Sequence, residues 1–256
     1  MRASTGNTRN CRPDRRMWHA IVPGVLLLVG VGRAEATLTT PTCLAKKLNE
    51  WGALRKCQAT EDAKRLLGKP AHPATCQTRF DTKLATLSEQ AKTAAVPCRF
   101  EANGNGTVTD YDTGLQWEQK TADGSVHDLG NEYTWSVTLG RRDGTVFADF
   151  LGTLNDATSS DGTTSSGCFA GHCDWRLPSI VELQAIVDAG APGCGSRGVC
   201  LDQTVFGPTI AFFYWSATTE TDFPVFAWGV AFGAEGQVTS AIEDATLFAR
   251  AVRSAL

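Results

Sequence analysis

The chain has 256 residues and a formal net charge of −3, and hydrophobic residues make up 42% of it. This near-average composition excludes a chain too polar to build a hydrophobic core. The length excludes three domains of ordinary size, so we expect two folded units after N-terminal processing. The 25 glycines indicate many turns.

The first 36 residues are typical of a cleaved signal peptide. Arginines precede an apolar stretch over residues 20–32, and Ala34-Glu35-Ala36 supplies the small-x-small cleavage pattern. The apolar stretch is shorter than the roughly 20 residues needed to span a bilayer. We therefore predict export, with no transmembrane span after cleavage. Translation from Met17 instead of Met1 is an alternative that would remove most of the positive region.

The chain has nine cysteines, and removal of the leader takes Cys11 away and leaves eight. An even number suits disulfides, which persist in the periplasm, at the cell surface or outside the cell. In the later part of the chain, sequence proximity favours the pairs Cys168–Cys173 and Cys194–Cys200. Reduced cysteines in a cytosolic protein are the alternative.

Charge divides the mature chain into two parts with different surfaces. Residues 37–98 carry ten Lys/Arg and five Asp/Glu, whereas residues 99–256 carry eight and twenty. In residues 37–98, apolar side chains recur every three or four positions in two stretches, which predicts two helices. Gly68, Pro70 and Pro73 separate the stretches. We therefore predict an antiparallel helical hairpin.

Such a small hairpin buries too little apolar surface to be stable alone, so we expect disulfides between its helices. Its four cysteines allow three connectivities. The nested pairs Cys43–Cys98 and Cys57–Cys76 are our first choice, although their two arms differ in length by about 12 Å at 1.5 Å per helical residue. Pro97 can end the second helix early and let Cys98 fold back.

From residue 99 onward, short strands and glycine turns replace the helical pattern. Residues 107–110 and 115–118 flank a turn and predict a β-hairpin. A helix is expected to begin near Thr134, and the Ser, Thr, Gly and Asp residues of 158–167 predict a solvated insertion. Ser179 and Glu182 form a capping box for a second helix that Gly190 ends. Three later strands are predicted, over 225–232, 237–242 and 247–253.

Several motifs in residues 99–253 arrive in the order found in one protein family. They are Thr107-Val108-Thr109-Asp110, Thr113-Gly114-Leu115-Gln116-Trp117, Asp174-Trp175-Arg176-Leu177-Pro178-Ser179 with Glu182-Leu183, Tyr214-Trp215-Ser216 and Arg250-Ala251-Val252-Arg253. On these motifs the chain resembles the Lcl C-terminal domain family, named after a collagen-like surface adhesin. The resemblance implies a C-type-lectin-like fold, secretion and contact with surfaces or carbohydrate.

The predicted fold class is therefore α+β: a C-type-lectin-like domain with two helices and short antiparallel strands, preceded by the disulfide-tied hairpin. The domain boundaries are a signal peptide over 1–36, the hairpin over 37–98 and the lectin-like domain over 99–256. The chain lacks the collagen repeats of the adhesin, which leaves its oligomeric state open. The net charge of −12 over 99–256 argues against binding sulfated polyanions.

The spacing of polar residues after residue 100 also resembles a calcium loop, with glycine at the sixth position and a carboxylate at the twelfth. The candidate ligands are Glu101, Asn103, Asn105 and Asp112. The first position is not Asp and the last is not Glu, and strand residues follow instead of a helix. Asn-Gly turns between strands explain the same residues more simply, so calcium is kept as an alternative.

Trp175, Arg176, Trp215 and Trp228 suggest a sugar-stacking site, because aromatic faces pack against pyranose rings. Core packing is the favoured reading, since aromatic residues dominate core energetics. Arg176 would then bond to buried carbonyls or a carboxylate.

Cys168, His172 and Cys173 offer too few ligands for structural zinc. The glycines at 193, 195 and 198 match a dinucleotide fingerprint but follow a helix, so we discount them. Phosphate-loop, metalloprotease and nucleophile-elbow motifs are missing from the sequence.

We therefore predict a secreted or surface-exposed adhesion-type protein, exported to the periplasm, cell surface or medium, whose ligand contacts come from residues 191–224 and neighbouring loops. Its expected partner is a glycan or a cell-envelope component, not nucleic acid. No cofactor is expected apart from the calcium alternative. The other hypotheses are an envelope structural protein without a small ligand and an enzyme related to the formylglycine-generating enzymes, which resemble this domain in one Arg-Leu-Pro block.

Overall fold

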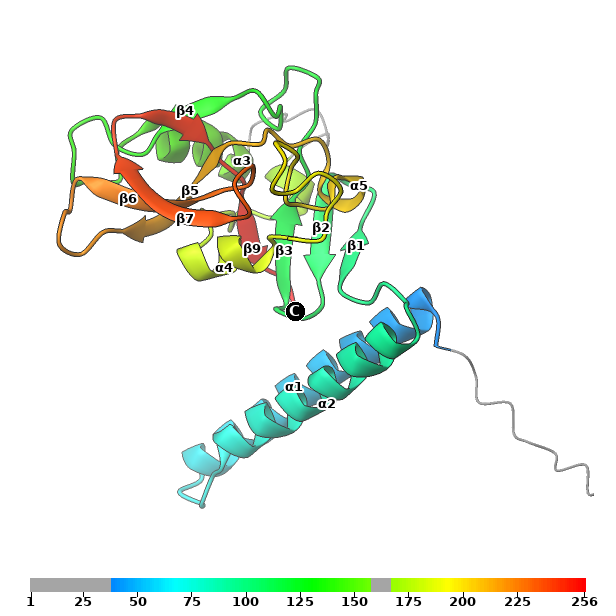
Figure 1. Cartoon of the computed structure of the whole chain (residues 1–256). Coiled ribbons are helices and arrows are strands. Elements are labelled where there is room, and N and C mark those ends of the chain that lie inside the picture. The colour runs from blue at the N-terminus through cyan, green and yellow to red at the C-terminus, as the bar shows by residue number, and fades with distance from the viewer. Residues whose placement is uncertain (1–37, 158–166) are drawn as a thin grey trace, which may run out of the picture. The chain divides into compact units, whose positions relative to one another are not determined.

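Two antiparallel helices open the part of the chain that the computed structural model describes, residues 38–157 and 167–256 (Figure 1). The predicted signal peptide lies outside these residues. Helix α1 spans Thr40–Leu66 and begins at a capping box of Thr39 and Thr42. Helix α2 spans Pro73–Thr93 and starts with a proline, which needs no hydrogen bond at that position.

Disulfides tie this hairpin together. Cys43–Cys98 and Cys57–Cys76 join the same cysteines as the predicted nested pairs. Cys98 reaches Cys43 because α2 ends at Thr93 and the chain turns at Ala95, which has a φ of 51°. Between the helices a small core is buried, and it consists of Leu54, Cys76, Phe80 and Leu84, with Trp51 packed against it.

The base of the hairpin packs on the following domain, and both belong to one compact unit that begins at Thr37. Cys43, Leu44 and Ala91 share an apolar cluster with Tyr111. The indole Nε1 of Trp51 donates a hydrogen bond to the Tyr111 carbonyl at 3.0 Å, and the buried Lys47 ammonium pairs with Asp112. Hairpin and domain therefore share an apolar and ionic junction.

A four-stranded antiparallel sheet begins the domain, in the order β1-β2-β3-β9. Its strands are β1 Phe100–Ala102, β2 Thr107–Asp110, β3 Leu115–Glu118 and β9 Val252–Ser254. The β2–β3 hairpin has the predicted bounds. Gly114, at φ 71°, supplies the turn, and a Cβ there would come within 2.7 Å of the Trp51 ring. Only glycine therefore lets Trp51 of the helical hairpin pack against the β2–β3 turn.

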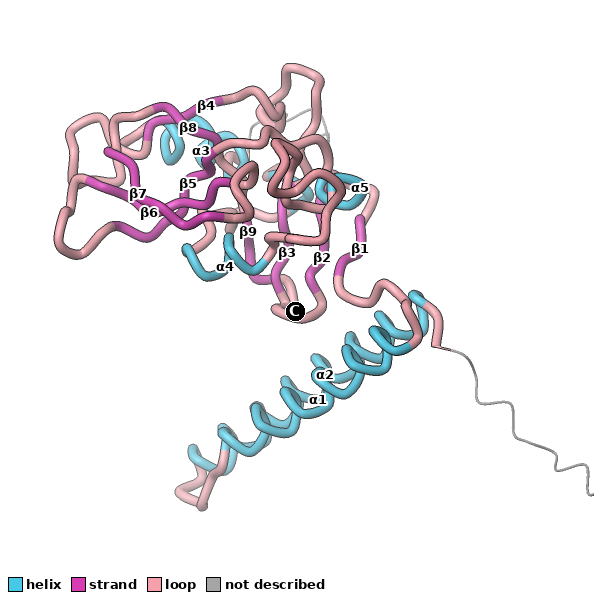
Figure 2. Tube along the Cα trace, in the orientation of Figure 1, coloured by secondary structure: helices cyan, strands magenta, loops and turns pink. Residues whose placement is uncertain are grey.

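A second sheet of five strands has the order β4-β8-β5-β6-β7 (Figure 2). The strands are β4 Glu132–Thr134, β5 Phe213–Thr219, β6 Phe226–Ala231, β7 Gln237–Ile242 and β8 Thr246–Phe248. The single strand predicted over 247–253 is wrong, because the chain leaves this sheet after Phe248 and enters the first sheet at Val252. Between them, buried Arg250 donates to the carbonyls of Glu118 and Phe206, which holds the chain at the crossing.

The helix start predicted near Thr134 is also wrong. Thr134 ends β4, and helical structure starts only at η1 Val146–Leu151, which continues into α3 Gly152–Asn155. Leu139 and Gly140 both have positive φ. A Cβ on Gly144 would lie 2.3 Å from the Thr134 carbonyl oxygen, so the chain folds back on itself where a helix was expected.

The capping box of Ser179 and Glu182 is present and starts α4 Ile180–Ala185. This helix ends before Gly190, because the amide of Asp188 bonds to the Cys200 carbonyl at 2.9 Å. Two short elements that the sequence did not indicate are η2 Phe169–Gly171 and α5 Gln203–Phe206. No helix among the described residues is long and apolar enough to cross a membrane. The fold class is α+β, as predicted.

Candidate functional site

The loop between α4 and α5 contains the Cys194–Cys200 disulfide, whose cysteines are only six residues apart in sequence. Inside it the chain crosses itself closely, because a Cβ on Gly198 would lie 2.5 Å from the Gly193 carbonyl. Gly193 has a φ of 83°, which only glycine adopts easily. The amide of Cys200 bonds to Phe232 at 2.8 Å, which ties the loop to the end of β6. The loop is therefore fixed before any ligand arrives.

An open cleft of about 370 Å³ lies beside this loop, within the range of small-molecule sites. Its lining residues are Asp188, Gly190, Ala191, Pro192, Val199, Leu201, Asp202, Gln203 and Thr204. A second hollow of about 200 Å³ shares Asp188 and Asp202 and continues past Phe100 and Phe206. The two hollows meet at the shared carboxylates.

Hydrogen-bond acceptors and a hydrogen-bond donor both line this cleft. Asp188 accepts a hydrogen bond from Gly190 through Oδ1, and Asp202 caps α5 by accepting from Thr204 through Oδ1. Among the described residues, Oδ2 of each aspartate has no hydrogen bond. Gln203 accepts from the Thr209 amide through Oε1 at 3.1 Å, which leaves its amide NH₂ group to donate. The cleft thus offers two carboxylate acceptors and one amide donor above an apolar wall.

The four candidate calcium ligands lie on the β1–β2 hairpin and its continuation, and each has a protein partner. Glu101 accepts from the Tyr111 hydroxyl at 2.6 Å, and burial together with this carboxylate raises the pKa of Tyr111 to about 12. Asn103 bonds to Thr107 and Thr109, Asn105 accepts from Thr107, and Asp112 pairs with Lys47. In the part of the chain described, no group of three or more His, Cys, Asp or Glu could hold a metal ion. Calcium stays an untested alternative.

The aromatic candidates divide between core and surface. Trp175 and Trp215 are buried in one apolar cluster and donate to the carbonyls of Phe169 and Tyr133. Trp228 on β6 is half-buried. Arg176 makes a bidentate ion pair with Glu182 at 2.7 and 2.8 Å, which is one of the predicted kinds of partner. None of these four residues lines the cleft.

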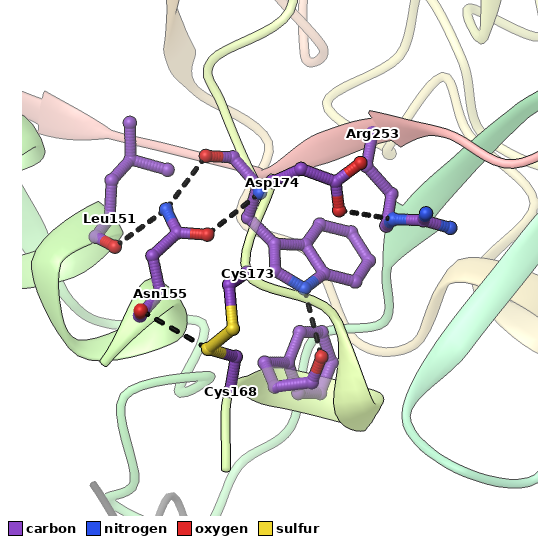
Figure 3. The surroundings of a disulfide bond; sticks show 8 residues. Leu151, Asn155, Cys168, Cys173, Asp174 and Arg253 are labelled. Carbon is purple, nitrogen blue, oxygen red and sulfur yellow. Dashed lines mark hydrogen bonds and ion pairs between the residues drawn. A yellow bond between two sulfur atoms is a disulfide. The ribbon is translucent and has the colours of Figure 1, made fainter. Parts of the chain in front are cut away.

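The Cys168–Cys173 disulfide closes a short loop of sequence separation 5, and Figure 3 shows its surroundings. The predicted insertion over 158–167 precedes this loop and, apart from Gly167, lies outside the described residues. The Asn155 amide donates to the carbonyls of Leu151 and Trp175, and its oxygen accepts from the Trp175 amide at 2.8 Å. Asp174 accepts from Arg253. Both cysteines are oxidised here, so they are not free to act as metal ligands together with His172.

Glu118, Lys120 and His127 form a buried ionic cluster that no sequence motif indicated. Glu118 accepts from Lys120 at 2.9 Å and from His127 at 2.8 Å through Oε1, and from the Ala251 amide through Oε2. Burial would raise the pKa of Glu118, but the charge of Lys120, the hydrogen bond with His127 and the charge of Arg250 outweigh burial and lower it. Burial lowers the pKa of Lys120. The cluster is closed to solvent and holds β3 against the segment before β9.

The domain is thus a disulfide-bonded α+β module whose loops carry an open cleft. The family model of the Lcl C-terminal domain matches residues 106–253, more than half of the chain, and the chain belongs to this family, as its motifs predicted. Membership indicates a surface or adhesin-type protein. No curated protein and no solved structure matches the chain, so the C-type-lectin-like label stays a prediction.

Proposed function

We propose that this protein is exported and binds carbohydrate at a surface through the cleft beside the Cys194–Cys200 loop. The proposal rests on the cleft of about 370 Å³, which has an apolar wall and polar groups without hydrogen-bond partners among the described residues. Loops on a rigid scaffold commonly carry recognition, and preorganised loops lose less entropy on binding. The proposal narrows the predicted region, residues 191–224 and neighbouring loops, to the residues that line one cleft.

The chemistry of the cleft suits a neutral sugar. Sugar hydroxyls both donate and accept, which matches the free Oδ2 atoms of Asp188 and Asp202 and the NH₂ group of Gln203. The apolar C–H faces of a sugar ring can lie on Pro192 and Val199. The two carboxylates and the net charge of −12 over residues 99–256 would repel sulfated or carboxylated glycans. The ligand class we propose is therefore neutral oligosaccharides.

Four disulfides support an extracytoplasmic location, because such bonds persist in oxidising compartments. Together with the predicted signal peptide, they favour the periplasm, the cell surface or the medium.

A glycan array with the purified mature protein, in the presence of calcium and of a chelator, tests the proposal. We expect binding to neutral glycans that the chelator leaves unchanged, since the cleft supplies its own polar groups. Asp188→Asn keeps the Oδ1 acceptor for Gly190, and Gln203→Glu keeps the acceptor for Thr209, yet each alters the group that faces the cleft. Both should weaken binding about tenfold, as the loss of one hydrogen bond to a charged or well-placed group does.

Asp222→Asn is the matched control, because Asp222 is exposed on the β5–β6 connection and does not line the cleft. Its binding should equal that of the wild type. The absence of any glycan signal, or equal binding by all three variants, would contradict the proposed site. Binding that calcium restores after chelation would point instead to the Glu101–Asp112 segment.

A further inference from the structure

The tip of the helical hairpin presents two adjacent leucines to solvent. Leu66 is 87% exposed and Leu67 is 71% exposed, and Leu66 is the most exposed large hydrophobic residue of the described chain. They end α1, just before the turn to α2. A single exposed leucine needs no explanation, but an adjacent pair at the end of a rigid hairpin forms an apolar tip that water solvates poorly.

The backbone of the tip fixes this exposure. The amide of Gly68 bonds to Arg65, the amide of Lys69 bonds to Lys64 at 2.9 Å, and the amide of His72 bonds to the Glu61 carboxylate at 2.7 Å. Gly68 has the positive φ that the turn requires. The Cys57–Cys76 disulfide clamps the helices on the near side of the tip. The leucines therefore have no route back to the small core of the hairpin.

Cations lie along the half of the hairpin that carries the leucines. Residues 53–83 carry seven Lys/Arg and three Asp/Glu. Lys64 and Arg65 pair with Glu61 and Asp62 one turn away. The other five form no ion pair in the described residues, and all five are exposed: Arg55, Lys56, Lys69, Arg79 and Lys83. This half of the hairpin, residues 53–83, therefore has an apolar tip and cationic helix surfaces.

We propose that the hairpin tip docks on an anionic lipid surface, with Leu66 and Leu67 entering the headgroup region and the lysines and arginines contacting lipid phosphates. Apolar side chains beside Lys/Arg are the pattern of segments that lie at membrane interfaces. Each such cation adds attraction that falls off within a Debye length of the surface. The lysine and arginine stems can extend their charged ends toward headgroups while the leucines enter.

The charge of the following domain favours this occupant and sets an orientation. Residues 99–256 carry a net charge of −12, whereas residues 37–98 carry +5. An anionic surface attracts the hairpin and repels the domain, so the tip faces the lipid. The competing occupant is the acidic domain of a second copy of this chain, which would pair with the cations and would appear in the test as self-association.

Co-sedimentation of the oxidised mature protein with vesicles tests the proposal. Phosphatidylglycerol vesicles should bind the protein, and phosphatidylcholine vesicles should bind it much more weakly. Raising the ionic strength from about 0.1 M to about 1 M shortens the Debye length from about 10 Å to about 3 Å and should release it. Leu66→Ser with Leu67→Ser should weaken partitioning about tenfold or more, even if the side chains are only partly buried in the bilayer.

Val181→Ser is the matched control, because Val181 is 72% exposed and belongs to α4, not to the hairpin. It should bind vesicles as the wild type does. Thermal unfolding confirms that the variants fold. Absence of binding to phosphatidylglycerol, or binding that the double serine variant retains, overturns the proposal. Concentration-dependent self-association without vesicle binding overturns it in favour of a second copy. These outcomes are independent of the glycan array.

Discussion

The buried Glu118 carboxylate should be among the most sensitive single positions in the domain. It has no exposed surface, and its oxygens accept from Lys120, His127 and the Ala251 amide at 2.8 to 3.0 Å. In Glu118→Gln, one oxygen can still serve Lys120 and His127, but the new NH₂ group then faces the Ala251 amide, which is also a donor. Lys120 also loses its counter-charge inside the protein. Removing one partner of a buried pair costs about 3–5 kcal/mol of unfolding free energy.

A double variant distinguishes the loss of the Glu118–Lys120 ion pair from a general disruption of the fold. Lys120→Met removes the stranded charge and keeps an apolar chain over the Phe150 ring, where the ammonium lies 4.6 Å from the ring centre. Replacing both partners of a buried ion pair by uncharged groups of similar size is often nearly neutral. We therefore expect Glu118→Gln with Lys120→Met to recover most of the loss, to within about 2 kcal/mol of the wild type.

Urea unfolding followed by tryptophan fluorescence measures these differences, with the disulfides kept oxidised. The pKa of Glu118 is lowered in the folded protein, so its contribution is present above its ordinary pKa and is lost as the pH falls through the lowered value. Glu118→Gln should therefore remove part of the acid sensitivity. A loss below about 1 kcal/mol for Glu118→Gln, the level of an ordinary surface hydrogen bond, would refute the reasoning, and so would a double variant no more stable than the single one.

Three further predictions concern stability. Burial raises the pKa of Glu243, so the contribution of this carboxyl to stability is greatest at low pH and is lost as the pH rises through the raised pKa. Glu243→Gln should therefore raise the melting temperature at neutral pH and flatten the dependence of the melting temperature on pH. An unchanged pH profile would count against this. Replacing Cys43 and Cys98 by alanine removes a disulfide between residues 55 apart in sequence and should lower the free energy of unfolding by about 4 kcal/mol. The same replacement of Cys168 and Cys173, only 5 residues apart, should lower it by about 2 kcal/mol. Equal losses in denaturant unfolding would contradict this. Gly198→Ala places a Cβ 2.5 Å from Gly193 and should destabilise the protein, whereas Gly52→Ala, in open space on α1, should stabilise it by about 0.5–1 kcal/mol in thermal unfolding; the opposite order would show that the loop relaxes freely.

Features set by neighbouring residues could be predicted from the sequence. The Ser179–Glu182 capping box, the β2–β3 hairpin and the close cysteine pairs depend on contacts within a few residues. The hairpin helices follow from apolar periodicity and from the prolines between them. For these elements the local preference and the final fold agree.

Features set by distant partners could not be predicted. Arg250 divides one apolar run into β8 and β9 because it bonds to carbonyls of Glu118 and Phe206, which are 132 and 44 residues away. The helix expected near Thr134 gives way to a turn that packs on the β4 backbone. The sequence predicted ligand contacts in residues 191–224 and neighbouring loops. It did not predict that Asp188 lines one cleft with Asp202 and Gln203, because this depends on the backbone contact between Asp188 and Cys200.

The proposed carbohydrate site depends most on the oxidised loop beside the cleft. Isothermal titration with the strongest neutral glycan from the array should be carried out on the wild type and on a variant with alanine at Cys194 and Cys200. The loop closes only six residues, so the variant should remain folded, with a loss of about 2 kcal/mol. We predict saturable binding by the wild type and at least about tenfold weaker binding by the variant. Equal affinities in two folded proteins would contradict it.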